Sequence, residues 1–404
     1  MPFILLIALF VSQFAMGTFA SYLPALVVKA TLTVAFTIAG GLGFLMLKRK
    51  RARQERIDNS YTLPTDKAGW ETVFPNLSML ENAAFEGLGA GDRLLLVGVT
   101  GGTGQQVVRG VMEAKTGAQI VVLTRNPDRP SAQQLRKAGC ELVKGDLDDE
   151  ASLKSACVGI TAMYCHGTSV DAAAADPVEV YRAERLARAA RDAGVQYIVY
   201  QSAGGADRDT GLPHMEQKYM VEELFRKSRV PCTMLRATLF MEELWKKYTR
   251  PAILKGTFQF AMPPTNKQQF VSCRDMGFAA ATVLKRSKEF EGKSVELCAD
   301  ELQWQEVAEA FSANQQASGL PLVSYKEAGF VTECIFWLIS DDLWNIIMFY
   351  RHRGYQANLK ECNKLFPGLT SFKEFLKQTK WADPTKTYED LSEAELETAA
   401  TAAQ

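Results

Sequence analysis

Short apolar runs alternate with amphipathic segments through the middle of this chain. The runs are four to seven residues long, as in RLLLVGV at 93–99, and the segments between them repeat apolar residues at helical spacing. This alternation is typical of βαβ units, whose parallel sheet is buried on both faces. Strands are predicted at 93–99, 119–123, 141–144, 161–165, 196–201 and 232–235, and helices at 104–114, 131–138, 149–156, 178–193 and 214–227.

The N-terminal stretch has a different pattern. Between Pro2 and Leu47 the only charged residue is Lys29, and the basic run KRKRAR follows at 48–53. About 20 helical residues cross a hydrocarbon core, so the stretch predicts two membrane spans, near 3–20 and 30–47, joined by a turn at 21–24. The alternative is a signal peptide that is cleaved after Ala20 and followed by one span, although no basic residue precedes the apolar run.

Both topologies leave the rest of the chain on the side of the basic run. The positive-inside rule keeps that run in the cytoplasm, so the predicted location is a membrane with the soluble domain facing the cytoplasm. The run also suits contact with anionic lipid headgroups. A nuclear-localisation signal is the weaker interpretation beside such an apolar segment.

Composition divides the chain into four parts. Residues 1–56 form the predicted membrane anchor, and 57–90 form a linker with scattered Pro and Gly. Residues 91–380 form the α/β domain, with a C-terminal lobe from about 237. Residues 381–404 are an acidic tail rich in Ala and Thr, where Ser392 and Glu395 resemble the capping box of a short helix.

Charge and cysteine content narrow the function classes. The 46 basic and 46 acidic residues of the 404-residue chain cancel, but residues 57–404 hold 39 basic and 45 acidic residues, a net charge of −6. That body lacks the positive footprint of a nucleic-acid-binding protein. The eight cysteines form no C-x-x-C pair and only three histidines are present. Free thiols are therefore favoured, and no metal site is predicted.

A glycine-rich segment, VGVTGGTGQQV at 97–107, follows the first predicted strand and opens the first predicted helix. This is the context of a dinucleotide fingerprint, in which glycines let the backbone approach a pyrophosphate at a helix N-terminus. Two registers are open. Gly98, Gly101 and Gly104 are evenly spaced, but Gly98 is expected inside the strand. The loop then rests on Gly101 and Gly104, with Val107 in place of the third glycine. An ordinary glycine turn is the alternative.

The end of the second strand bears on cofactor choice. The sequence there is TRNPDR at 124–129, whereas an NAD site usually has Asp or Glu to bind the ribose 2′-hydroxyl. Arg125 instead suits the 2′-phosphate of NADP, and Arg129 adds a second charge. The alternative is a solvated loop arginine. Asp146 ends the third strand and is expected beside the adenine; the alternative is a helix N-cap, and the two roles are compatible.

Several of these stretches together resemble the NmrA-like family of atypical short-chain dehydrogenase/reductases. The resemblance covers about residues 93–380 and implies NADP as cofactor and a C-terminal domain closing over the nicotinamide. The predicted fold class is therefore α/β: a doubly wound parallel Rossmann sheet, a smaller C-terminal α/β substrate domain and an N-terminal transmembrane segment. The resemblance is carried by 101–106, 124–127, 145–146, 214–223, 230–236, 240–243 and 269–272, and by Asp275.

The resemblance also implies roles by position. Family members often have Asn where Glu243 stands and Lys where Tyr181 stands, so this chain departs from the pattern at both. The implied contacts are with the pyrophosphate for Gly101, Gly102, Thr103, Gly104, Gln105 and Gln106, with the 2′-phosphate for Arg125, Asn126 and Arg129, with the adenine for Asp146 and Leu147, with the edge of the fourth strand for Gly167 and Thr168, and with the nicotinamide ribose for Lys218.

The catalytic motif is altered. Ordinary short-chain reductases pair a Ser with Tyr-x-x-x-Lys, whereas this chain has Ser202 and then HMEQK at 214–218. His214 thus stands at the tyrosine position. Histidine transfers protons near neutral pH, so His214 and Lys218 are the candidate catalytic residues. The alternatives are that His214 only starts a helix and that Lys218 pairs with Glu222 one turn on.

Three functions are compatible with these features. The first is a membrane-tethered NADP(H)-binding redox sensor or regulator with a protein partner. The second is an NADPH-dependent reductase of a hydrophobic carbonyl or quinone, and the third is a structural subunit. No direct nucleic-acid contact is expected. The aromatic stretch 330–350 contains Asp341 and Asp342, which argue against a membrane span. The stretch is predicted to form amphipathic helices that cover a substrate cleft, and a partner groove is the alternative.

Overall fold

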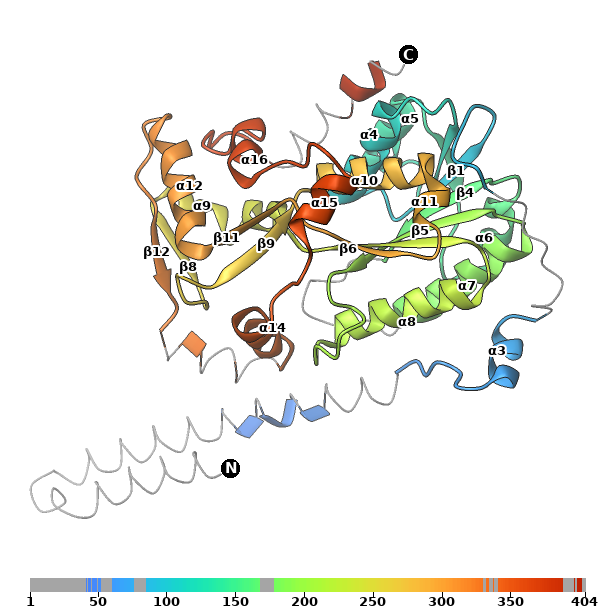
Figure 1. Cartoon of the computed structure of the whole chain (residues 1–404), viewed down its shortest axis with the longest axis horizontal. Coiled ribbons are helices and arrows are strands. Elements are labelled where there is room, and N and C mark those ends of the chain that lie inside the picture. Colours follow the sequence, from blue (N-terminus) through green and yellow to red (C-terminus); the bar gives the residue numbers. More distant parts are fainter. Residues whose placement is uncertain are drawn as a thin grey trace, which may run out of the picture.

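A seven-stranded parallel sheet lies at the centre of this computed structural model (Figure 1). Its order is β10-β6-β5-β4-β1-β2-β3. The strands are β1 (Arg93–Val97), β2 (Gln119–Thr124), β3 (Glu141–Lys144), β4 (Ala162–His166), β5 (Tyr197–Ala203), β6 (Cys232–Ala237) and β10 (Ser294–Leu297). The structure describes residues 41, 43–44, 46–48, 50–51, 60–75, 85–167, 178–329, 332–333, 337, 341–387, 396 and 398–401.

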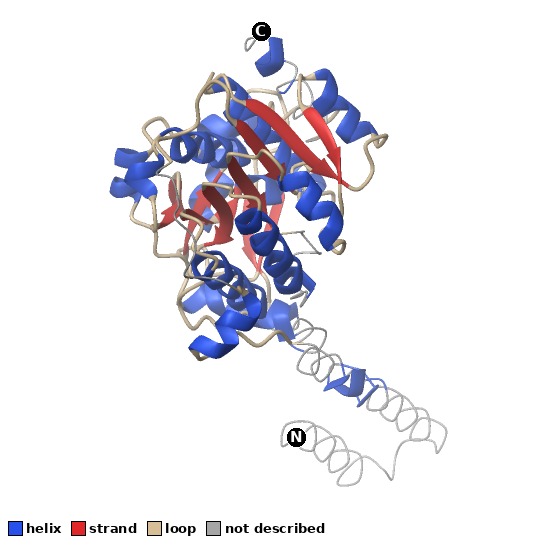
Figure 2. Cartoon of the chain, turned by 90° about the vertical axis from the view of Figure 1, so that its right-hand side faces the viewer, coloured by secondary structure: helices blue, strands red, loops and turns tan. Residues whose placement is uncertain are grey.

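Helices cover both faces of this sheet, as Figure 2 shows. One face carries α4 (Gly102–Glu113), α5 (Pro130–Lys137) and α10 (Cys273–Lys285). The other carries α6 (Glu150–Cys157), α7 (Val178–Asp192) and α8 (Pro213–Lys227). In β1, Leu94 and Leu96 pack on the first face, and Leu95 and Val97 on the second. Burial on both sides explains why the strands are continuous apolar runs.

The doubly wound topology predicted from the sequence is confirmed. The chain runs outward from β1 to β3 and then crosses to β4 on the other side of β1. In such sheets ligands bind outside the carboxyl ends of the strands at the point where the direction of winding reverses. That point lies between β1 and β4.

One strand of the main sheet comes from far downstream. β10 pairs with β6 in parallel, with Val295 opposite Leu235. The predicted elements omitted this short segment. The chain therefore leaves the main sheet after β6, near the predicted boundary at 237, but returns to it for α10, α11 (Ser287–Phe290) and β10. The C-terminal lobe is not one continuous segment.

Two glycines bring α4 and α10 into close contact. A side-chain carbon on Gly110 would overlap the backbone of Gly277, and one on Gly277 would overlap the carbonyl of Gln106. Backbones can approach this closely only where no Cβ intervenes. The contact fixes α10, which follows the lobe's strand β9 (Lys267–Val271), against α4, which follows β1.

The C-terminal lobe has its own aromatic core, around Phe258, Trp304 and Phe311. It contains a three-stranded sheet of order β11-β9-β7 and a parallel pair, β12 and β8. Its elements are β7 (Leu239–Phe240), η2 (Met241–Trp245), α9 (Arg250–Leu254), β8 (Thr257–Phe260), β9 (Lys267–Val271), β11 (Asp300–Gln303), α12 (Trp304–Gln316), β12 (Ser324–Glu327), α14 (Asp341–His352), α15 (Leu359–Leu365) and α16 (Phe372–Gln378).

Residues outside the predicted α/β domain also contribute to the cores. Phe74, at the end of α3 (Lys67–Val73), is fully buried, and the Arg191 guanidinium lies 5.3 Å from its ring centroid. Trp381 is fully buried, and its ring lies edge-on to Trp245. The segments predicted as linker and acidic tail therefore both hold residues that pack.

The predicted membrane spans near 3–20 and 30–47 fall almost entirely outside the described residues. Ser392 and Glu395 of the predicted capping box also lie outside them. No helix in the described part of the chain has both the length and the apolar character needed to cross a bilayer.

A buried carboxyl group predicts how stability depends on pH. Burial raises the pKa of Glu242 to about 7, against an ordinary value of 4.5, and burial also raises the pKa of nearby Asp275. The folded state then binds the Glu242 proton more tightly than the unfolded state. This contribution is fully present below about pH 4.5 and is lost as the pH rises to about 7.

Replacing Glu242 by Gln is expected to remove that loss, which amounts to about 3 kcal/mol. Urea titrations at pH 5 and pH 8 measure it as a change in the unfolding free energy. The wild type is expected to lose more stability than Glu242→Gln between the two pH values. Identical pH profiles for the two proteins would contradict the assignment.

Candidate functional site

The glycine loop between β1 and α4 has the evenly spaced register. β1 ends at Val97, and Gly98 already has a φ of 85°, so Gly98 lies in the loop and not inside the strand as expected. A side-chain carbon on Gly104 would overlap the backbone of Val99. Gly104 therefore permits the close approach of helix and strand that the third fingerprint glycine provides, and Val107 does not take that position.

The loop presents backbone amides at the start of α4. Gly101 occupies the N-cap without a side-chain hydrogen bond, and Gly102 and Thr103 begin the helix. Helix N-termini of this kind bind phosphate through their N–H groups. Gln105 and Gln106 are buried: the Gln105 amide donates to Gln134, and Gln106 accepts from Arg109. Any contact of these two glutamines with a pyrophosphate would be through the backbone.

The three residues predicted to bind a 2′-phosphate lie together after β2. Arg125, Asn126 and Arg129 are all exposed. The turn is held by Asn126, whose side-chain oxygen accepts from the Asp128 N–H, and Arg129 occupies the N-cap of α5. The two guanidinium groups are thus presented to solvent at the carboxyl edge of the sheet, next to the glycine loop in the strand order.

The end of β3 adds further charge. Asp146 accepts from the Asp148 N–H, and Asp149, not Asp146, caps α6. The N-cap alternative for Asp146 is therefore wrong. Arg182 from α7 binds Asp148 with two nitrogens, and this contact holds the pKa of the Asp148 carboxyl below its usual range. Sequence reasoning missed Arg182, because its partner lies 34 residues away.

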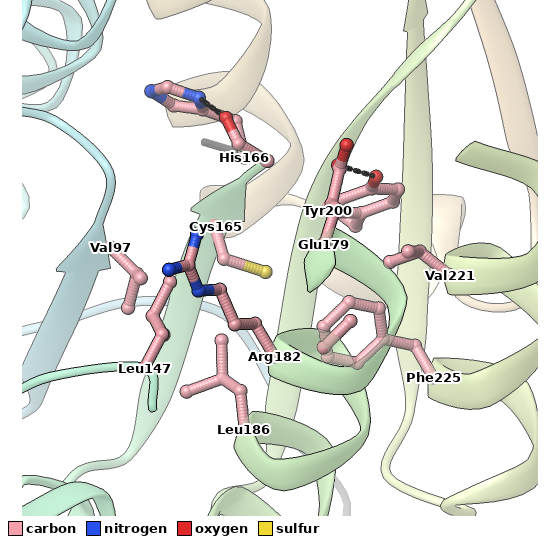
Figure 3. Close-up of a pocket in the computed structure, with 12 residues that line it drawn as sticks. Val97, Leu147, Cys165, His166, Glu179, Arg182, Leu186, Tyr200, Val221 and Phe225 are labelled. Carbon is pink, nitrogen blue, oxygen red and sulfur yellow. Dashed lines mark hydrogen bonds between the residues drawn. The ribbon is translucent and has the colours of Figure 1, made fainter. Parts of the chain in front are cut away.

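The end of β4 lies at the winding reversal. Figure 3 shows His166, whose Nδ1 hydrogen-bonds the Gly167 carbonyl at 2.7 Å, and Glu179, which accepts from the Tyr200 hydroxyl. A void of about 20 Å³ lies among these side chains, bounded by Leu147 and other apolar residues. Burial lowers the pKa of His166. Thr168, predicted to lie beside Gly167, is outside the described residues.

Lys218 reaches this point from α8. Its ammonium forms an ion pair with Glu179 of α7, and the pair lies over Gly167. The alternative partner, Glu222, is fully buried and binds Arg226 and Arg236 instead. The surface-lysine interpretation of Lys218 is therefore wrong, since its side chain is only 21% exposed.

A cavity of about 450 Å³ opens beside the pair, between the main sheet and the C-terminal lobe. His214, Lys218 and Ser202 all line it. Burial lowers the pKa of His214, which keeps its ring neutral near pH 7, and its Nδ1 has no hydrogen-bond partner among the described residues. The same holds for the buried Ser202 hydroxyl. The two predicted catalytic residues thus meet a serine, all facing one cavity.

The lobe supplies an aromatic wall to the cavity. α14 contributes Tyr350, whose hydroxyl lies 3.3 Å from that of Tyr355. Part of the stretch 330–350 thus forms a helix over the cavity, as one sequence-based alternative predicted. Glu243, at the position where the family often has Asn, also lines the cavity and pairs with Lys246 at 2.6 Å. The remaining aromatic residues of the wall are Phe240, Tyr248, Phe260 and Trp304.

Comparison with known proteins agrees with this architecture. The model of the NmrA-like family matches residues 91–376. The chain belongs to the NmrA-like family.

Tyr181, where the family often has Lys, is 42% exposed on α7 and packs edge-on against Tyr61. No group of three or more His, Cys, Asp or Glu residues suited to a metal is present in the described part of the chain.

Individual relatives span several activities. Photosystem II assembly factor Ycf39 of Guillardia theta is 31% identical over 172 residues, which cover 41% of this chain and 52% of that protein. Quinone oxidoreductase 2 of Escherichia coli is 28% identical over 207 residues, covering 51% of this chain and 68% of that protein. The chain thus matches about half the length of the Ycf39 relatives.

Solved structures share the fold. Triphenylmethane reductase of Citrobacter, in complex with NADP(H), has a TM-score of 0.59 at 24% identity, covering 71% of this chain and 99% of that one. The NADPH-dependent quinone oxidoreductase of Escherichia coli, in complex with NADPH, has a TM-score of 0.58 at 23% identity, covering 70% and 98%. NmrA, a negative transcriptional regulator, has a TM-score of 0.57 at 17% identity, covering 75% and 97%.

Proposed function

We propose that this protein binds NADP(H) and reduces a hydrophobic aromatic quinone or carbonyl compound in the cavity between sheet and lobe. The observation that carries the proposal is the convergence of His214, Ser202 and Lys218 on an aromatic-walled cavity at the carboxyl edge of the sheet. A pocket of this size and character suits a small aromatic molecule. Two of the similar structures, the quinone and triphenylmethane reductases, lend support by analogy of fold.

The residues present fit the cofactor. Gly98 and Gly104 leave no room for a Cβ against His166 and Val99, the space beside Gly101 is open, and the N-terminus of α4 offers N–H groups to a pyrophosphate. Arg125 and Arg129 provide charge for a 2′-phosphate. When bound, NADPH would supply a hydride.

Side chains around the cavity stabilise the negative charge that develops on the substrate oxygen. A neutral His214 carries one ring N–H, which donates a hydrogen bond to the substrate oxygen as negative charge develops there, and solvent supplies the proton that this oxygen then takes up. The Lys218 ammonium stabilises that charge, and the Ser202 hydroxyl has a free donor to orient the oxygen. The aromatic wall makes one side of the cavity apolar, which strengthens these interactions.

Replacing His214 by Phe is expected to lower kcat about 100-fold, because the hydrogen bond to the developing negative charge is lost. The NADPH dissociation constant should change little. NADPH oxidation measured against benzoquinones, naphthoquinones and aromatic aldehydes tests this, with His352→Phe on the exposed end of α14 as the matched control. Equal rates for the two variants would rule out the role of His214.

The altered Tyr-x-x-x-Lys motif favours a second candidate, an NADP(H)-dependent regulator that binds nucleotide without turnover and acts through a protein partner. Its signature is tight NADP(H) binding, no oxidation of NADPH by any compound of the panel, and a nucleotide-dependent change in hydrogen exchange around the cavity. Binding without that change would favour a structural subunit instead.

Attachment to a membrane, with the soluble domain on the cytoplasmic side, is part of the proposal. It is supported by the apolar stretch 2–47 and the basic run that follows it. Membranes washed with carbonate are expected to retain the full chain and to release a variant that lacks residues 1–56. Release of both proteins would contradict the attachment.

A further inference from the structure

We propose that Glu179 is the positioning residue of this site: its carboxylate holds the Lys218 ammonium over the backbone of Gly167, at the end of β4. This inference rests on the proposed function, in which Lys218 stabilises charge on the substrate oxygen, and on the contact with the nicotinamide ribose that the family resemblance implies for Lys218. It adds a residue from a different helix, 39 positions away in the sequence, on which the placement of that ammonium depends.

Gly167 makes this arrangement sterically feasible. A side-chain carbon at position 167 would overlap both the Glu179 carboxylate and the Lys218 ammonium. The pair therefore uses the space that any other residue would fill. Gly167 lacks a positive φ, so its role is to leave room and not to allow an unusual backbone conformation.

The surroundings restrict both charged groups. The Glu179 side chain is 12% exposed and the Lys218 side chain 21%. Tyr200, buried in β5, donates its hydroxyl to the same carboxylate oxygen at 3.3 Å, and its ring centroid lies 5.8 Å from the Lys218 ammonium. Three elements, α7, α8 and β5, thus meet in one contact. An ion pair held this way keeps a fixed geometry, unlike an exposed lysine with a mobile side chain.

The pair also sets the electrostatic environment of the two histidines in the cavity. The Lys218 charge lowers the pKa of His166 and of His214, and the Glu179 charge raises both, although burial is the largest influence on each. The other groups that face them are Asp342 of α14, which raises the pKa of His214, and the backbone of Gly98 and Gly167, which raises that of His166. Removing either charge of the pair therefore shifts the pKa of both histidines. Loss of the Glu179 charge lowers both pKa values, and loss of the Lys218 charge raises both.

Histidine titration followed by NMR tests the arrangement in the full chain without cofactor. The chain has only three histidines, and His352 lies outside the cavity as an internal reference. In Glu179→Gln the pKa of both His166 and His214 should fall, because the Glu179 charge that raises both pKa values is removed. In Lys218→Met both should rise. Glu216→Gln, an exposed position on the same helix as Lys218, is the matched control and should leave both unchanged.

NADPH affinity gives a second readout with a diagnostic sign. If Glu179 only repelled the phosphates of the nucleotide, Glu179→Gln would bind NADPH more tightly. A positioning role predicts binding about 3- to 10-fold weaker, since the ammonium loses its fixed place. Unchanged pKa values of His166 and His214, or tighter NADPH binding, would overturn the inference. Because the titration needs no turnover, its outcome is independent of whether the protein proves to be a reductase.

Discussion

Arg125→Ala is expected to weaken NADP(H) binding about 10- to 100-fold while NAD(H) binding changes much less. A hydrogen bond between charged groups contributes about 1.5–3 kcal/mol, and only NADP(H) carries the 2′-phosphate that would accept it. Arg125 is exposed directly after β2, and its side chain makes no hydrogen bond with the residues that the structure describes, so its removal breaks no such contact within the protein. Calorimetric titration of both nucleotides measures the ratio of the two losses.

Arg136→Ala provides the matched control for this prediction. Arg136 is an equally exposed arginine in the last turn of α5, away from the loop. Its removal changes the net charge by the same amount, so any general attraction of the phosphates is matched. Equal losses of affinity for NADP(H) and NAD(H) in Arg125→Ala would show that Arg125 does not bind the 2′-phosphate.

Glu222→Ala is expected to cost about 3 to 5 kcal/mol of folding stability. Its carboxylate is fully buried and binds the Arg236 guanidinium with both oxygens, at 2.9 and 2.7 Å. The Arg236 side chain is only 6% exposed, so the substitution leaves a buried cation with Asp207 as its remaining partner. Urea unfolding at neutral pH measures the loss.

A substitution of the neighbouring Glu223 provides the control that separates the effect of burial from the effect of losing a charge. It pairs with Arg226 at 2.8 Å, but its side chain is 24% exposed and that of Arg226 29%. Glu223→Ala is therefore expected to cost less than about 1 kcal/mol. Similar losses for the two variants would mean that the buried contact with Arg236 is not what stabilises this part of the fold.

The parallel sheet was predictable because its signal is local. Each strand is an apolar run bounded by polar residues, and burial on both faces requires that pattern wherever the strand lies in the sheet. β3 was predicted with its observed limits, and the other strands within about two residues. β10 escaped prediction because SVEL is short and partly polar, and only its pairing with β6 identifies it as a strand.

The register of the glycine loop is a feature that the local sequence pattern does not determine. Three evenly spaced glycines were visible, but the choice of register depended on where β1 stops. That point is set by the backbone of Gly98, which turns beside His166 of the neighbouring strand, with the His166 carbonyl 3.0 Å from where a Cβ would lie. Strand ends are decided by such contacts between strands and not by the residues of one strand alone.

The candidate site divides in the same way. Arg125 and His214 are predictable because one follows a strand and the other opens a helix, and Ser202 and Lys218 because they match the Ser and Lys of the short-chain reductase motif. The partners Glu179, Arg182 and Tyr355 were not, because they approach from helices or loops distant in sequence.

The sequence by itself determined six of the seven strands of the main sheet, the helices between them and the glycine and arginine motifs, because apolar periodicity and short spacings act within a few residues. Only the tertiary structure decided which register the loop adopts, that Lys218 meets Glu179 and not Glu222, and that an aromatic lobe encloses the cavity. Those outcomes depend on how far helices pack from one another, and at Gly110, Gly167 and Gly277 the absence of a single carbon sets that distance.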